Sequence, residues 1–175
     1  MTETEGMTGS RTRRMVGGGA LAGVIGGLVI SLLMLALRGV RGEDPWVGLK
    51  VAGYPFLHDR VLRPGFDGGA VLLGLADHLA VSAVWGILFA LLAFGLARWA
   101  TVGFGAAWGL IAMFVMTYLV LPIAGCLRVE ESMPVGRSVL GHVAFGVAMA
   151  LAFLPFQRHQ PRALNHRWMT SGASP

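Results

Sequence analysis

Residues 15–37 read MVGGGALAGVIGGLVISLLMLAL, a stretch of 23 residues without a charged side chain. An α-helix rises about 1.5 Å per residue, so about 20 apolar residues cover the hydrocarbon core of a bilayer. The stretch has no alternation of period two, and the open edge of a strand would leave backbone groups unpaired in lipid. It therefore predicts a transmembrane helix.

Three further apolar stretches are long enough to cross a bilayer: residues 70–97, 103–125 and 139–156. The first of them is interrupted only by Asp77 and His78, and the last contains only His142. Together the four stretches predict an all-α membrane protein with a four-transmembrane-helix bundle over residues 15–156.

The composition excludes other classes of protein. Of the 175 residues, 55% are hydrophobic, 13% are charged and 26 are glycine, and the mean hydropathy is +0.66. A soluble domain carries about 25% charged residues, so neither a soluble enzyme nor a disordered chain fits. The pI of about 10.7 comes from basic residues in short flanks between apolar stretches. That distribution is typical of membrane orientation, so we expect a lipid bilayer and no nucleic acid as partner.

The segments outside the spans are predicted to differ in character. Residues 1–14 and 157–175 are expected to be flexible basic tails, and residues 38–69 an interfacial loop. Within this loop, Asp44 and Pro45 favour the start of a short helix, as an N-cap and a first-turn residue.

Four spans place both termini on one side of the membrane. Lysine and arginine do not decide which side, because each side receives seven of the 14. The cluster Arg11, Arg13 and Arg14 directly precedes the first span, and basic residues there favour the cytoplasm. The sequence therefore predicts a multi-pass inner-membrane protein with both termini cytoplasmic.

The spans also match one another, which predicts an internal repeat. An offset of 86 positions places Gly19 and Gly23 of the first span on Gly105 and Gly109 of the third. An offset of 64 positions places His78 on His142. The chain is thus interpreted as two parallel helix hairpins, and an ordinary bundle of two unrelated hairpins is the alternative.

Small residues recur every four positions along the spans. Because lipid supplies little hydrophobic drive between helices, such residues let two backbones approach closely and pack. We expect helix packing, within the bundle or between protomers, at Gly19, Gly23, Gly27, Ser82, Gly86, Gly105, Gly109 and Gly146.

The histidines are the candidate functional residues, because ionisable groups inside a membrane are costly and often functional. Three interpretations of His78 and His142 remain open. In the first, they lie at head-group level and bond to water or loop carbonyls. In the second, they bind haem or a divalent metal, with His58 or Asp77 completing the ligand set. In the third, they belong to a proton or ion path. The leading expectation is that the protein binds no cofactor.

Short motifs add a resemblance. They are Pro-Phe-Leu-His at residues 55–58, His-x3-Ser-x3-Gly at 78–86, and Gly-His-Val-Ala-Phe-Gly at 141–146, which follows Pro122. With them the chain resembles small four-span bacterial inner-membrane proteins without an assigned activity. The resemblance implies a four-helix architecture in a bacterial cytoplasmic membrane, and implies no reaction.

The sequence contains no triad, no paired catalytic carboxylates and no nucleotide fingerprint. A non-enzymatic accessory or scaffold protein is therefore expected, forming a homo-oligomer or joining a larger membrane complex. The alternatives are a haem- or metal-binding protein that uses His78 and His142, and a small dimeric transporter or channel.

Overall fold

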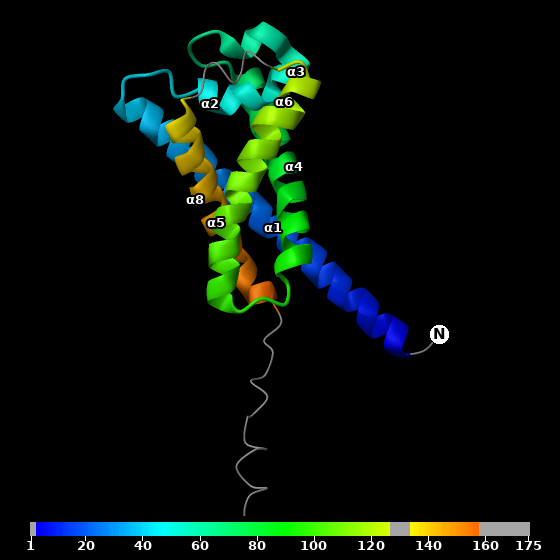
Figure 1. Ribbon diagram of the computed structural model, residues 1–175. Helices are drawn as coiled ribbons and strands as arrows, with labels where there is room; N and C mark the ends of the chain where they lie inside the picture. The colour runs from blue at the N-terminus through cyan, green and yellow to red at the C-terminus, as the bar shows by residue number, and fades with distance from the viewer. Residues whose placement is uncertain (1–2, 127–133, 158–175) are drawn as a thin grey trace, which may run out of the picture.

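The computed structural model describes residues 3–126 and 134–157, with side chains from Thr12 onward, and every element in these ranges is helical (Figure 1). Four helical segments are long and apolar enough to cross a membrane: Thr12–Val40, Gly68–Ala93, Arg98–Ile123 and Val135–Phe156. This confirms the predicted all-α four-helix bundle. The predicted C-terminal tail lies outside the described residues, apart from Gln157.

The helices begin earlier than predicted. Helix α1 (Glu3–Val40) includes most of the segment predicted as a flexible tail. Helix α4 (Gly68–Ala93) begins after Asp67, whose carboxylate caps it. Helix α8 (Val135–Phe153) begins after Pro134 and continues into the short 3₁₀-helix η4 (Leu154–Phe156).

The third span changes its winding near one end. Helix α5 (Arg98–Val115) passes into a π-helical turn, η3 (Met116–Val120), and then into α6 (Leu121–Ile123). Pro122 lacks an N–H and cannot continue an α-helical ladder, so the turn before it widens. Gly125 then ends the helix with φ of +71°, a conformation that favours glycine.

Residues 41–67 fold into a cap over the end of the bundle that we call the loop end. Four short elements form it: α2 (Val47–Lys50), η1 (Val51–Gly53), α3 (Tyr54–Leu57) and η2 (His58–Leu62). The helix predicted at Asp44 and Pro45 begins at Val47, and the Asp44 carboxylate accepts the N–H of Trp46 at 3.0 Å.

Lys50 holds the cap together from inside. Its side chain is 1% exposed, and Nζ donates to the carbonyls of Arg63 at 2.5 Å and Gly65 at 2.8 Å. Asp44 lies 3.9 Å from the same ammonium group and accepts the N–H of Gly65. A buried charge needs such partners, so Lys50 ties the two ends of the cap to each other.

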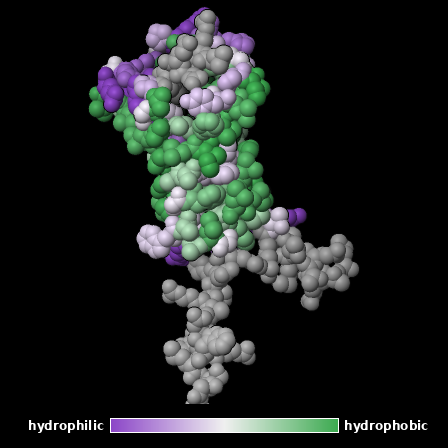
Figure 2. Space-filling model, viewed as in Figure 1, coloured by the Kyte–Doolittle hydropathy of each residue, from purple (hydrophilic) through white to green (hydrophobic). Residues whose placement is uncertain are grey.

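The opposite, terminal end carries both chain ends. Arg14 of α1 donates to the carbonyl of Pro155 at 3.2 Å, joining the first and last spans there. The space-filling view shows an apolar band around the bundle, flanked by hydrophilic residues at the two ends (Figure 2). That distribution is the one expected of a membrane-spanning bundle.

Helix α1 is the central element of the bundle. It packs against both α4 and α8, and α5 packs against α8, whereas α4 and α5 stay further apart. Aromatic side chains fill the space between α4 and α5: Trp85 meets Trp108, and Phe89 stacks on Phe104.

The predicted packing residues lie in two seams where helix backbones touch. In the first seam, a Cβ on Gly23 of α1 would collide with the carbonyl of Ser82, and one on Gly86 of α4 with the carbonyl of Gly19. Gly27 faces the Ser82 hydroxyl group. The prediction of packing within the bundle holds here, since these positions are closed by neighbouring helices.

The second seam joins α5 and α8 in the same way. Gly105 of α5 faces Gly146 and Ala150 of α8, and Gly109 faces the His142 carbonyl and Gly146. The first seam has the same two sets of contacts. There Gly19 faces Gly86 and Ala90, and Gly23 faces the Ser82 carbonyl and Gly86.

The two seams correspond at offsets of 86 positions for α1 and α5, and of 60 positions for α4 and α8. The second offset differs from the predicted 64 by four residues, about one helical turn. A shift of one turn keeps the same face of the helix, so apolar matching alone does not distinguish the two offsets. His142 therefore corresponds to Ser82 in packing, and the duplication itself stays a prediction.

We expect Gly23→Leu to lower the free energy of unfolding by about 1–3 kcal/mol, because the new side chain must push α1 away from α4. Gly17→Leu on the same helix is the matched control, since nothing lies within 4 Å of a Cβ there. Unfolding by SDS in mixed micelles measures both variants. Equal stabilities would contradict the seam.

The start of α4 supplies a pH-sensitive contact. The Asp67 carboxylate binds the Arg60 guanidinium through both oxygens, at 2.9 and 3.1 Å, and accepts the N–H of Ala70. The bond to Arg60, and then that to Ala70, lower the pKa of Asp67 from 3.8 to about 2.

A lowered pKa in the folded state stabilises the fold above pH 3.8, and this contribution disappears as the pH falls from 3.8 to about 2. We expect the thermal midpoint of the protein in detergent to fall more steeply across that interval than the midpoint of Asp67→Asn. Asparagine still caps the helix but carries no charge, so parallel curves would contradict the assignment.

Candidate functional site

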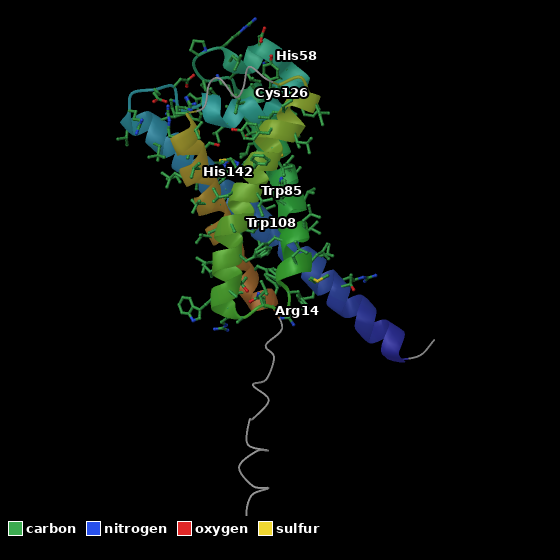
Figure 3. The ribbon with its side chains drawn as sticks, in the orientation of Figure 1. Arg14, His58, Trp85, Trp108, Cys126 and His142 are labelled. Carbon is green, nitrogen blue, oxygen red and sulfur yellow. The ribbon has the colours of Figure 1, made fainter. Side chains whose placement is uncertain are left out.

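The candidate site consists of His78 and His142, of which Figure 3 labels His142, in the loop-end half of the bundle. His78 lies on α4, and its Nε2 is 3.3 Å from the carbonyl oxygen of Gly27 on α1. Glycine brings the two helices close enough for this contact. On the same face of α4, seven and eleven residues further on, Trp85 and Phe89 point toward α5.

His142 reaches the site from α8. Its Nδ1 lies 2.8 Å from the carbonyl oxygen of Ser138, one turn earlier in the same helix. The backbone at His142 packs against Gly109 of α5, and its neighbour Gly141 packs against Ile30 of α1. His142 is therefore placed between α1 and α5, on the side of α8 that faces the interior.

The two carbonyl contacts define the proton positions on the rings. A carbonyl oxygen accepts and never donates, so Nε2 of His78 and Nδ1 of His142 carry the protons. In the neutral rings the lone pairs then lie on Nδ1 of His78 and Nε2 of His142. Among the described residues no buried side-chain nitrogen or oxygen lacks a hydrogen-bond partner.

The two histidines lie at a similar depth, because each meets α1 near the same residues. Helix α1 sets this arrangement, because Gly27 meets His78 while the neighbouring Gly26 packs on Phe145, three residues after His142. The predicted approach of the α4 and α8 faces is also seen further along, where the rings of Phe89 and Phe153 are 5.8 Å apart.

A tryptophan pair lies beyond the histidines toward the terminal end (Figure 3). The rings of Trp85 and Trp108 are 5.5 Å apart, and Nε1 of Trp108 donates to the carbonyl of Trp85 at 3.2 Å. Both are partly buried against the apolar core, whereas Trp99, at 89% exposure, is at the bundle surface. The pair fills the interior next to the histidines with apolar surface.

The other predicted metal ligands lie elsewhere. His58 is exposed in the cap, with φ of +47° and its ring 6.1 Å from that of Tyr54. Asp77 is turned about 100° from His78 on the helix, and its charge acts on Cys126. Burial, and then Asp77, raise the pKa of the Cys126 thiol.

The four predicted ligands are thus not brought together. His78 and His142 lie on two spans, whereas His58 lies in the cap. In the described ranges no three His, Cys, Asp or Glu side chains converge in a metal-binding group. What the sequence analysis missed is the role of two backbone carbonyls, of Gly27 and Ser138, which carry no signal in the sequence.

Comparisons with protein-family models, curated proteins and solved structures find no match to this chain. Function is therefore argued from the site alone, and the resemblance to small bacterial inner-membrane proteins stays a prediction.

Proposed function

We propose that this multi-pass membrane protein binds a transition-metal ion between His78 and His142. One observation carries the proposal: imidazoles on two helices of the bundle each direct one N–H to a backbone carbonyl, which leaves the second ring nitrogen as a lone-pair donor. A histidine that ligates a metal commonly donates its second N–H to a carbonyl or carboxylate, which orients the ring and raises its basicity.

The placement of the pair favours binding over a purely structural role. Each ring needs only one nitrogen for its hydrogen bond, and a phenylalanine or leucine would fill the same space without the cost of burying an imidazole. If the histidines only lay at head-group level and bonded to carbonyls, this would account for the one hydrogen bond that each ring makes. It gives no reason for histidines on two different helices to lie at a similar depth inside the bundle.

The other candidate functions lack a comparable observation. A self-associating scaffold was expected from small-residue surfaces, but Gly19, Gly23, Gly105 and Gly109 are covered within the chain. A role in a larger complex, or as a dimeric transporter, stays a prediction.

The metal site is tested on protein purified in mild detergent, loaded with Zn(II), Co(II) or Cu(I) and analysed for bound metal. We expect about one ion per chain. Losing an outer partner of a ligand already costs about 10–100-fold in affinity, so His142→Ala and His78→Ala should each lose about 100-fold or more.

His58→Ala is the matched control, because that histidine is exposed in the cap. His78→Gln is a second variant that keeps an N–H donor for the Gly27 carbonyl while removing the imidazole lone pair. Metal bound equally by all these variants, with unchanged thermal stability, would overturn the proposal.

The orientation in the membrane is also proposed. We expect the terminal end, with Arg14 and Arg98, to face the cytoplasm of a bacterium, which places the cap and the histidine pair in the outer half of the bilayer. Alkaline phosphatase fused after Pro175 should be inactive, and a fluorescent protein fused there should be bright. Active phosphatase at that position would reverse the orientation.

A further inference from the structure

We propose that the loop-end corner between α1 and α8 binds the phosphate group of an anionic phospholipid. Three charged side chains form this arginine corner: Arg38 at the end of α1, Glu43 in the turn that follows, and Arg137 in the first turn of α8. The end of α1 and the start of α8 lie side by side at the loop end (Figure 1). This binding does not require the proposed metal site.

The turn after α1 places Glu43 next to Arg38. Helix α1 ends in a Schellman motif, in which the N–H of Glu43 donates to the carbonyl of Arg38 at 3.0 Å and that of Gly42 to the carbonyl of Gly39 at 3.1 Å. Gly42 has φ of +69°, a conformation that favours glycine. The turn therefore returns the Glu43 carboxylate to the Arg38 guanidinium, with 3.6 Å between the charged atoms.

Packing between α1 and α8 brings the second arginine to the same place. A Cβ on Gly141 of α8 would meet the Met34 side chain of α1, so the two antiparallel helices touch there. One turn closer to the loop end, Arg38 follows Met34 and Arg137 precedes Gly141. Both guanidinium groups consequently meet the same oxygen of Glu43, Oε2, at 3.6 Å from Arg38 and 2.5 Å from Arg137.

The arginine corner carries more positive charge than its carboxylate balances. Elsewhere in the cap a single cation meets a single carboxylate, as in the pairs Lys50–Asp44 and Arg60–Asp67. Glu43 is instead shared by two guanidinium groups, so one positive charge is left over. A guanidinium has five N–H donors and a carboxylate about four acceptor positions, so many donors are left over as well.

The two arginines are also more buried than an ordinary surface charge. The side chain of Arg38 is 12% exposed and that of Arg137 is 19% exposed, compared with 50% for Arg60. A charge that is withdrawn from water is costly unless it is paired and hydrogen-bonded. A second anion at the corner would balance the remaining charge and accept the remaining N–H groups.

The depth of the corner indicates that this anion belongs to a lipid. One span ends at Val40 and the other begins at Val135, each two residues from an arginine of the corner, so the corner lies at head-group level. Arginine binds phosphate through two parallel hydrogen bonds. Leu140, three residues after Arg137 and one turn deeper, is half-exposed and offers apolar contact to an acyl chain. Free phosphate has no group for that contact.

The test measures lipid binding to the full chain in mild detergent by native mass spectrometry. Phosphatidylglycerol and phosphatidylcholine with identical acyl chains are titrated separately. We expect about one phosphatidylglycerol per chain, bound at least about tenfold more tightly than phosphatidylcholine, whose choline cation cancels the phosphate charge. Equal binding of the two lipids would overturn the proposal.

Arginine variants locate the site. Arg38→Gln and Arg137→Gln should each weaken phosphatidylglycerol binding by about tenfold or more, because each removes charge-assisted hydrogen bonds to the phosphate. Arg60→Gln is the matched control, since it removes the same charge from the same end of the bundle but from an exposed pair with Asp67. A loss of equal size in the control would mean attraction by net charge alone and would overturn the site.

Glu43→Gln separates lipid binding from a structural role of the corner. This variant breaks the same ion pairs as the arginine variants, yet it frees both guanidinium groups for phosphate. Phosphatidylglycerol binding should therefore rise, by about two- to fivefold for the release of an ion pair at the surface. A loss of binding in Glu43→Gln would contradict the proposal.

Inorganic phosphate distinguishes a lipid from a free anion. In large excess over the lipid it should leave phosphatidylglycerol bound, because it makes no apolar contact. Displacement of the lipid by inorganic phosphate, with the same dependence on Arg38 and Arg137, would assign the corner to a free anion and overturn the lipid site.

Discussion

Direct contact between helix backbones at glycine is the constraint on which the rest of this structure depends. In lipid, apolar side chains gain little by leaving their surroundings for another helix, so helices associate through close van der Waals contact. Gly23 against Ser82 and Gly109 against the His142 carbonyl provide that contact in two seams. Helix α1 also packs on α8, through Gly26 against Phe145, and so joins the two seams.

This arrangement also positions the histidines. Because α1 approaches α4 at Gly27, a backbone carbonyl inside the membrane comes within reach of His78. Because α1 also packs on α8, His142 is held at the same depth, and its own helix supplies the Ser138 carbonyl. These two carbonyl contacts orient the rings, which is the feature on which the proposed metal site rests.

Several features were predictable from particular residues. The uncharged stretch at 15–37 predicted the first span, Asp44 predicted the start of a cap helix, and the spacing of Gly19, Gly23 and Gly27 predicted a packing face. Other features were not. The offset between α4 and α8 differs by one turn from the predicted one, and His58 and Asp77 do not join the other two candidates.

By itself the sequence determined that this is a helical membrane protein with four spans, because hydropathy and length act locally along the chain and the bilayer demands satisfied backbones. It also determined which helix faces carry small residues. Only the tertiary structure decided that the seams are internal, that Trp85 and Trp108 face inward, and that His78 meets the Gly27 carbonyl. The physical reason is that helix pairing depends on register and crossing between distant segments, and backbone carbonyls, which every residue carries, become specific partners only once those helices meet.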